Sequence, residues 1–177
     1  MPLLVASACR PPIRWLRSCG GETIRRDGWM VPRTNLRIAV DDDIPLMHRI
    51  RMSVVENRLS DPSRVQPAHY HAMLRSGRGW VCEVDGVVVG FAIADLANHS
   101  VWALFVEARH ERRGIGRQLH DAMIEWLFES GATRISLSTG PQTRAERFYE
   151  ATGWQRAGDD VNGDVRYELV RDRFATR

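Results

Sequence analysis

Lysine is absent from this 177-residue chain, in which all 25 strongly basic residues are arginine. A phosphate loop of the Walker type needs a lysine beside its glycines, so this class of nucleotide site is excluded. The three cysteines, Cys9, Cys19 and Cys82, form no C-x-x-C pair and no even set. This argues against a disulfide framework and against a thiolate zinc site, and we expect a cytoplasmic protein.

Long apolar runs are also missing. None approaches the roughly 18 to 20 residues that a membrane-spanning helix needs, so we expect a soluble protein. Metal ligands are sparse as well, because His69 and His71 form an isolated His-x-His pair without carboxylate or cysteine partners at ligand spacing. The sequence predicts no metal site.

Positive charge is concentrated at the N-terminus of a chain whose net charge is +3 and whose pI is about 9.1. Residues 1–34 hold six arginines against Glu22 and Asp27, and the remainder is close to neutral. Proline and glycine interrupt any helical periodicity in this segment. We expect a basic extension over residues 1–34, which is disordered, resembles a transit peptide, or reflects a start codon assigned ahead of Met30. One domain is expected over residues 35–177.

Strand and helix patterns alternate from residue 36 onward. Alternating or β-branched runs predict strands at 36–40, 80–84, 87–94, 101–106, 134–138, 154–157 and 165–170. Helical spacing predicts helices at 44–55, 67–76, 116–130 and 143–151. Three aspartates, Asp41–Asp43, offer an N-cap to the first helix, and Asp85-Gly86 predicts a tight hairpin turn. Hairpins and one βαβ crossover together predict an α/β (α+β mixed) fold, an open, mostly antiparallel mixed sheet flanked by helices.

A glycine-containing loop, Glu111-Arg112-Arg113-Gly114-Ile115-Gly116-Arg117, joins the 101–106 strand to the following helix. Its glycines allow a tight turn that exposes backbone N–H groups at a helix N-terminus, where the helix dipole favours negative charge. A dinucleotide fingerprint would need a third glycine where Leu119 stands. The loop therefore predicts a phosphate site of another kind.

Two segments together resemble the GNAT superfamily of N-acetyltransferases. The loop is similar to the Arg/Gln-x-x-Gly-x-Gly/Ala pyrophosphate motif of that family, although Glu111 occupies the first position. Residues 144–154 resemble the closing signature, represented here by Ala145, Tyr149, Gly153 and Trp154. The likeness covers residues 36–174 in element order. It implies a GNAT-like acyl-CoA N-acyltransferase fold and transfer of an acetyl group from acetyl-CoA, without a metal, to a primary amine by direct attack.

The resemblance also implies site residues. Tyr149 would protonate the departing coenzyme A sulfur unless it only packs in the core, and Glu107 is our candidate for the base unless it is a solvated strand-end carboxylate. The backbone N–H of Val106, freed by a local bulge, would bind the oxyanion. Cofactor binding is assigned to Leu104, Phe105 and Val106 along the pantetheine arm, to Arg112, Arg113, Gly114, Ile115, Gly116 and Arg117 around the pyrophosphate, and to Gln142, which stands where the family often has asparagine.

The acceptor, a small-molecule or peptide amine, is expected between residues 57–70 and the turn at 158–164. Asp159, Asp160 and Asp164 in this turn form either a solvated hairpin tip or an attractive surface for a cationic amine. Whether the chain forms a homodimer stays open.

Two other functions fit the same residues. A non-catalytic acyl-CoA-binding or sensor module would keep the loop and lack turnover. A nucleic-acid-associated protein would bind through the basic extension, with a steep dependence on salt. For the domain itself we expect neither nucleic acid nor membrane as a partner.

Overall fold

The structure is a computed structural model that describes residues 33–54, 65–161 and 163–175. The predicted extension therefore lies outside the described residues up to residue 32. The first strand begins at Thr34, one residue before the predicted start of the domain. It begins there because Thr34 pairs with Val84 and because the N–H of Arg33 donates to the Asp85 carboxylate at 3.1 Å.

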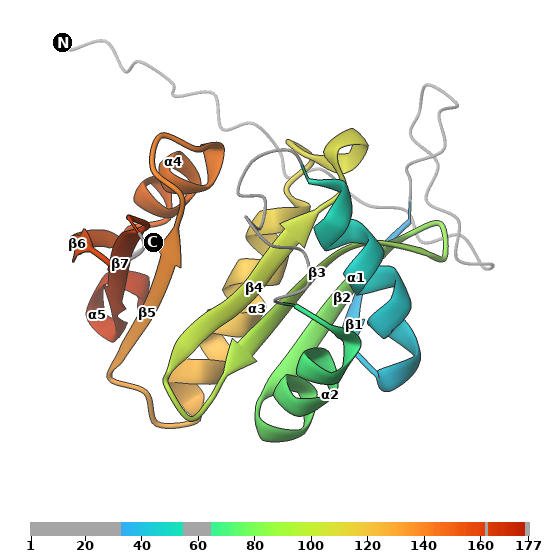
Figure 1. Cartoon of the computed structure of the whole chain (residues 1–177), viewed down its shortest axis with the longest axis horizontal. Coiled ribbons are helices and arrows are strands. Elements are labelled where there is room, and N and C mark those ends of the chain that lie inside the picture. The colour runs from blue at the N-terminus through green and yellow to red at the C-terminus, as the bar shows by residue number, and fades with distance from the viewer. Residues whose placement is uncertain (1–32, 55–64, 162, 176–177) are drawn as a thin grey trace, which may run out of the picture. The chain divides into compact units, whose positions relative to one another are not determined.

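Residues 33–175 contain a seven-stranded sheet with helices on both faces (Figure 1). The strand order is β1-β2-β3-β4-β5-β7-β6, and β4 and β5 are the parallel pair in an otherwise antiparallel sheet. The strands are β1 (Thr34–Ile38), β2 (Arg78–Val84), β3 (Val87–Asp95), β4 (Ser100–Val106), β5 (Arg134–Thr139), β6 (Gln155–Asp159) and β7 (Val165–Val170). The helices are α1 (Ile44–Ser53), α2 (Pro67–Ser76), α3 (Ile115–Glu129), α4 (Arg144–Ala151) and α5 (Arg171–Ala175), with 3-10 turns η1 (Asp41–Asp43) and η3 (Ala108–His110).

Each face of the sheet has its own hydrophobic core. On the face covered by α1 and α2, Met47, Ile50 and Tyr70 pack with Phe91 of β3. On the face covered by α3 and α4, the core includes Leu119, Met123, Leu127 and Tyr149.

The β4 side chains divide between these two cores. Ala103 and Phe105 pack on the α1 and α2 side, whereas Leu104 and Val106 pack on the α3 side. Since both faces of β4 are covered, the backbone along its edge is the part of this strand that is left to meet a ligand.

The predicted fold class is confirmed: the element order and the β4-α3-β5 parallel crossover are those that the sequence patterns indicate. The hairpin turn is also as predicted, because Asp85 and Gly86 both have positive φ, at 52° and 81°. Helix α2 has the predicted bounds, and Thr143 caps α4 by accepting from the N–H of Glu146 at 3.3 Å.

Most strand and helix bounds lie one or two residues from the predicted ones, with β1 ending at Ile38 instead of residue 40, and three further details differ. Helix α1 ends at Ser53, since Val54 has extended backbone angles, and residue 55 lies outside the described residues. The Asp43 carboxylate accepts from the N–H of Val40 at 2.9 Å instead of from a helix N–H. Helix α5 was not predicted: it is held by tertiary contacts. Arg171 donates to the carbonyl of Phe128, and the Phe174 ring packs against the Phe128 ring in a tilted arrangement with 5.9 Å between the ring centroids.

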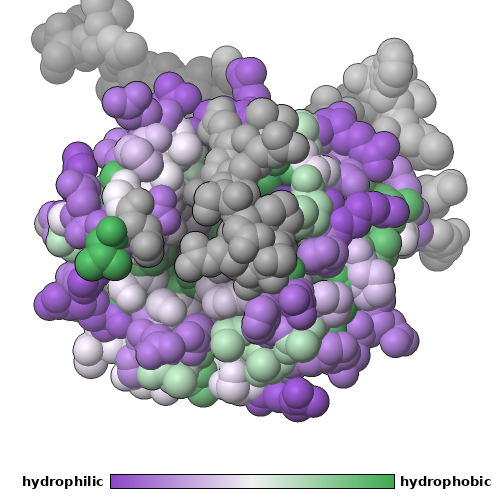
Figure 2. Space-filling view, viewed as in Figure 1, coloured by the Kyte–Doolittle hydropathy of each residue, from purple (hydrophilic) through white to green (hydrophobic). Residues whose placement is uncertain are grey.

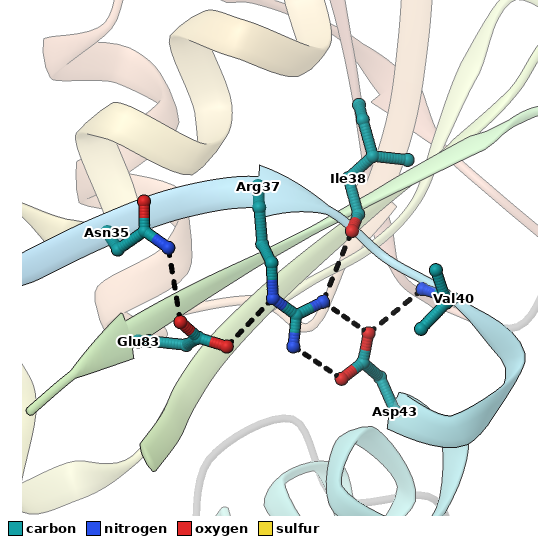
Figure 3. A network of polar contacts seen from close by, with 6 residues as sticks. All are labelled: Asn35, Arg37, Ile38, Val40, Asp43 and Glu83. Carbon is teal, nitrogen blue, oxygen red and sulfur yellow. Dashed lines mark hydrogen bonds and ion pairs between the residues drawn. The ribbon is translucent and has the colours of Figure 1, made fainter. Parts of the chain in front are cut away.

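Arg37 joins β1, β2 and the start of α1 (Figure 3). Its guanidinium donates two hydrogen bonds to Asp43, at 2.7 and 2.8 Å, and one to Glu83, at 2.7 Å. The Asp43 side chain is only 7% exposed, and the Arg37 hydrogen bonds hold the pKa of that carboxyl below its usual value. The network fixes the N-terminus of α1 against the edge of the sheet.

Arg37→Met is expected to lower the free energy of unfolding at pH 7 by roughly 2 to 4 kcal/mol, because it leaves a buried carboxylate without its partner. Urea titration would measure this loss. The matched control is Arg134→Met. The side chain of Arg134 is 61% exposed in its pair with Glu168, so this substitution should change stability by less than about 1 kcal/mol. Equal effects of the two substitutions would contradict the structural role of the network.

The pH dependence of Asp43→Asn checks the same network. A carboxyl whose pKa is lowered on folding stabilises the protein fully above its unfolded value of 3.8, and this contribution is lost as pH falls through the folded value. The stability difference between the wild type and Asp43→Asn should therefore be largest near neutral pH and should shrink below about pH 4.

None of the described helices is both long enough and apolar enough to cross a membrane. Figure 2 shows hydrophilic residues around small hydrophobic areas on the face that carries α1 and α2. Among residues 33–54, 65–161 and 163–175, the large exposed hydrophobic residues are Ile38, Val40, Met52, Val87 and Val161.

Candidate active site

The strands β4 and β5 separate after a single pairing. Ser100 pairs with Ser136, and the N–H of Ser136 donates to the carbonyl of His99 at 3.0 Å. No further pair of the two strands follows in this part of the sheet, and Figure 1 shows them diverging toward their C-terminal ends. The later residues of β4 therefore have a sheet neighbour on one side only.

Hydrogen bonding to β3 shows which β4 groups face the open side. The N–H of Glu107 donates to the carbonyl of Val89 at 2.8 Å. Because alternate residues of an antiparallel strand bond to the same neighbour, Phe105 and Ala103 also bond toward β3. The backbone N–H and C=O groups of Leu104 and Val106 then point toward the side that β5 has left. An extended amide-containing chain can add to this edge by backbone hydrogen bonds.

The bulge that the resemblance implied lies at Trp102. Ile93 pairs with Ala103 and Ala94 with Val101, so β4 has one extra residue at this point. Such an insertion increases the local twist of a strand. It lies just after the Ser100 pairing, where β4 turns away from β5.

The N-terminus of α3 follows β4 and presents free donors. Gly114, with φ 82° and ψ −4°, is its N-cap, and no side chain caps the helix or places an acidic group in its first turn. The N–H of Gln118 makes the first bond within the helix, to the carbonyl of Gly114 at 3.1 Å. The backbone N–H groups of residues 114–117 thus have no partner within the helix, which is the arrangement that an anion site at this position would need.

Two arginines of the loop are available to such an anion. Arg112 and Arg113 are exposed, and neither has an ion pair within the described residues. Arg117 is paired with Asp121 at 3.0 Å along the helix. Of the three arginines predicted to bind phosphate, Arg117 is therefore the one whose guanidinium already has a carboxylate partner.

The carboxylate of Glu111, which disagrees with the family motif, has a cationic partner. Arg144 at the start of α4 lies 2.5 Å from Glu111 Oε2. The pair neutralises a charge that would otherwise repel phosphate, and it joins the loop to α4 across the opening between β4 and β5. This role of Arg144 could not be predicted, because the two residues are 33 positions apart in the chain.

Gln142, the remaining predicted cofactor residue, lies in the turn before α4. It has φ 61°, and its N–H donates to the Glu146 carboxylate at 2.6 Å. Its side chain is exposed. Since Arg144 is two residues farther along, the Glu111–Arg144 pair brings this turn to the same side of the molecule as the loop.

Tyr149 has a buried ring and a free hydroxyl. The ring packs edge-on against Phe148 at 5.4 Å and Trp154 at 5.6 Å. Burial raises the pKa of Tyr149 above its usual value of 10, so the phenol stays protonated at neutral pH. Its hydroxyl makes no hydrogen bond to any described residue and, unlike that of Tyr70, is not sealed from solvent. Such a group can donate to a ligand.

Trp154 fixes the closing segment on α3. Its indole N–H donates to Nε2 of the fully buried His120 at 2.9 Å. Nε2 is therefore the unprotonated ring nitrogen, and Nδ1, which lies 2.7 Å from Asp121, carries the proton. The contact joins the helix that begins at the glycine loop to the residues that surround Tyr149.

Glu107, the predicted base, is engaged by its neighbours. Its carboxylate lies 2.9 Å from Arg109 Nε and 3.3 Å from His110 Nδ1. Both contacts are made to Oε2, and no described residue bonds to Oε1. Oε1 is the oxygen that could accept a proton, and the sequence does not reveal that Oε2 is engaged by Arg109.

The predicted acceptor regions are only partly described, since residues 57–64 lie outside the described residues. In the turn between β6 and β7, the Asp159 carboxylate pairs with Arg156 at 2.7 Å, and the Asp160 carboxylate accepts from the N–H of Asp164 at 3.1 Å. These local partners favour the hairpin-tip interpretation over an attractive surface for cations.

No group of three or more histidine, cysteine, aspartate or glutamate residues is placed to hold a metal within residues 33–54, 65–161 and 163–175. His69 and His71 have separate partners. His69 Nδ1 accepts from the N–H of Gln66 at 3.0 Å, and His71 lies 3.1 Å from Asp41.

The Acetyltransferase (GNAT) family model matches residues 46–154, which is more than half of the chain and includes β4, the glycine loop and α4. A GNAT-family acetyltransferase from Staphylococcus aureus Mu50 superposes with a TM-score of 0.68 at 18% identity, over 78% of this chain and 99% of that one. The ribosomal-protein-S18-alanine N-acetyltransferase from Escherichia coli gives 0.64 at 16% identity, over 78% and 94%. A Salmonella typhimurium protein named as an acetyltransferase and solved with acetyl-CoA gives 0.64 at 20%, over 78% and 94%. The chain belongs to the GNAT acetyltransferase family and is an acyltransferase of the N-acetyltransferase type.

Proposed function

We propose that the protein transfers the acetyl group of acetyl-CoA to the primary amine of an acceptor by direct attack. One observation carries the proposal: the unpaired edge of β4 leads directly to the uncapped N-terminus of α3. The edge suits the amides of the pantetheine arm, and the helix terminus suits the pyrophosphate. Coenzyme A carries both an amide-containing arm and a pyrophosphate, so the two features together match its chemistry better than either does alone.

The same geometry assigns roles in the reaction. The amine nitrogen attacks the thioester carbonyl carbon, the C–N bond forms, and the C–S bond breaks. In this proposal the backbone N–H of Val106 binds the oxyanion, and the Tyr149 hydroxyl donates to the departing sulfur. An amine with a pKa near 10.4 must first lose a proton, either to Oε1 of Glu107 or to water.

A thiol-release assay with acetyl-CoA tests the proposal against simple amines, aminoglycosides, amino acids and peptide N-termini. We expect at least one acceptor class to release coenzyme A well above the rate of hydrolysis without acceptor, with an acetylated amine as the product by mass spectrometry. Tight coenzyme A binding without thiol release over the whole panel would instead support the non-catalytic module.

A further inference from the structure

Three buried polar atoms on the α1 and α2 face of the sheet have no hydrogen-bond partner. The atoms are Nδ1 of His48 and Nε of Arg51, both from α1, and the hydroxyl oxygen of Tyr70 from α2. Within the described part of the chain, none of the three residues has another polar partner. We call these three residues the Arg51 cluster.

The Arg51 cluster lies over β4. The guanidinium carbon of Arg51 is 4.6 Å from the centroid of the Phe105 ring. The Tyr70 ring meets the Trp102 ring edge-on at 5.1 Å and the His48 ring at 5.8 Å. The cluster is thus held by the strand whose edge would receive the thioester.

The charge of Arg51 is only partly compensated. The Phe105 ring attracts the guanidinium through its face, but it offers no acceptor along the Nε–H bond, which lies in the guanidinium plane. Burial lowers the pKa of Arg51, and no carboxylate is among the groups that oppose this effect. Burial likewise raises the pKa of Tyr70 to about 12, so its hydroxyl remains a donor.

The chemistry of the cluster defines its ligand. Arginine and tyrosine offer donors, and the histidine nitrogen can donate in one tautomer or when it is protonated. A ligand that satisfies them must present acceptor oxygens and a negative charge. One guanidinium balances the single charge of a carboxylate, whereas a phosphate dianion would leave one charge without a counter-ion.

We propose that the Arg51 cluster binds a carboxylate of the acceptor, so that the substrate is a small amine of the amino-acid type. The inference rests on the proposed function. Phe105 stands between Leu104 and Val106, whose backbone groups face the opening, and successive strand residues are roughly 3.3 Å apart. A carboxylate on Arg51 would lie beside the Phe105 ring, and we place the amine of the same molecule toward the edge of β4 that would receive the thioester.

Matched acceptors test this inference in the thiol-release assay. Each set contains an amino acid, its carboxamide and the amine without the carboxyl group, such as L-phenylalanine, L-phenylalaninamide and 2-phenylethylamine. We expect kcat/KM for the carboxylate member to exceed that of the carboxamide at least about tenfold, the scale of one charged hydrogen-bonded pair. Equal values for the members of each set would overturn the proposal.

Arg51→Gln should remove this preference by lowering kcat/KM for the carboxylate member alone. Arg49→Gln is the matched control, because Arg49 is an exposed arginine of the same helix and its loss changes the net charge equally. Tyr70→Phe keeps the ring contacts and should weaken the preference in the same direction. A uniform loss across all three members of a set would assign Arg51 to packing and refute the inference.

A binding measurement separates this inference from the proposed function. With coenzyme A present, the amino acid should raise the melting temperature of the wild type and of Arg49→Gln but not of Arg51→Gln. If that shift appears without thiol release, the proposed function fails and the carboxylate site stands. If thiol release occurs without a carboxylate preference, or if neither signal appears, the carboxylate site fails.

Discussion

Gly114→Asp is expected to abolish the binding of coenzyme A in a protein that still folds. A Cβ at this position meets no atom within 4 Å, and the backbone has φ 82°, a conformation that aspartate adopts more readily than most residues. The new carboxylate would accept from the N–H groups of α3 that should hold the pyrophosphate. At about 4 Å and an effective dielectric of about 20, repulsion of unit charges is near 4 kcal/mol, so we expect Kd to rise at least about a hundredfold.

Two controls separate charge from backbone strain. Gly114→Asn has nearly the same shape without the charge, and it should weaken binding much less. Gly131→Asp adds the same charge at the other end of α3, where φ is 103° and the space for a Cβ is again open. Isothermal titration with coenzyme A should give wild-type affinity for Gly131→Asp. A folded Gly114→Asp protein with an unchanged Kd would place the pyrophosphate elsewhere.

Much of the fold could be predicted because local patterns and tertiary contacts agree in it. The apolar stripe of α3 and the Asp85-Gly86 turn specify their own structures, and nothing in the surrounding protein opposes them. The failures occur where distant contacts decide. Helix α5 depends on Phe128, which precedes it by more than 40 residues, and so its five residues carried no helical period to recognise.

The candidate site likewise has features that the sequence predicts and features that only the folded structure reveals. The donors at residues 114–117 follow from glycine spacing next to a strand, and they were predictable for that reason. The sequence does not predict three side-chain contacts, which are those of Glu107 with Arg109, of Glu111 with Arg144, and of Arg51 with the Phe105 ring. Each contact depends on how two side chains that are not part of one sequence motif meet in the folded protein. Such contacts change the charge of the site, but no periodicity or motif in the sequence indicates them.

Tyr149→Phe is expected to lower kcat by about a hundredfold, the lower end of the effect of a positioned general acid, with little change in the KM for acetyl-CoA. The ring contacts with Phe148 and Trp154 survive in this variant, and only the hydroxyl is removed. Because burial raises the pKa of Tyr149 above 10, the wild-type kcat should not fall through ionisation of this residue below about pH 10.

Tyr167→Phe is the control that separates chemistry from packing. Its ring lies 6.4 Å from that of Tyr149, and its hydroxyl lies 3.0 Å from carboxylate oxygens of Glu146 and Glu150. Loss of that hydroxyl should lower the melting temperature and leave kcat close to wild type, because its partners belong to α4 and not to the open edge of β4. The two tyrosines share one core, so a purely structural role would give them the same signature. If Tyr149→Phe keeps the wild-type kcat when chemistry limits the rate, the proton for the departing sulfur must come from water.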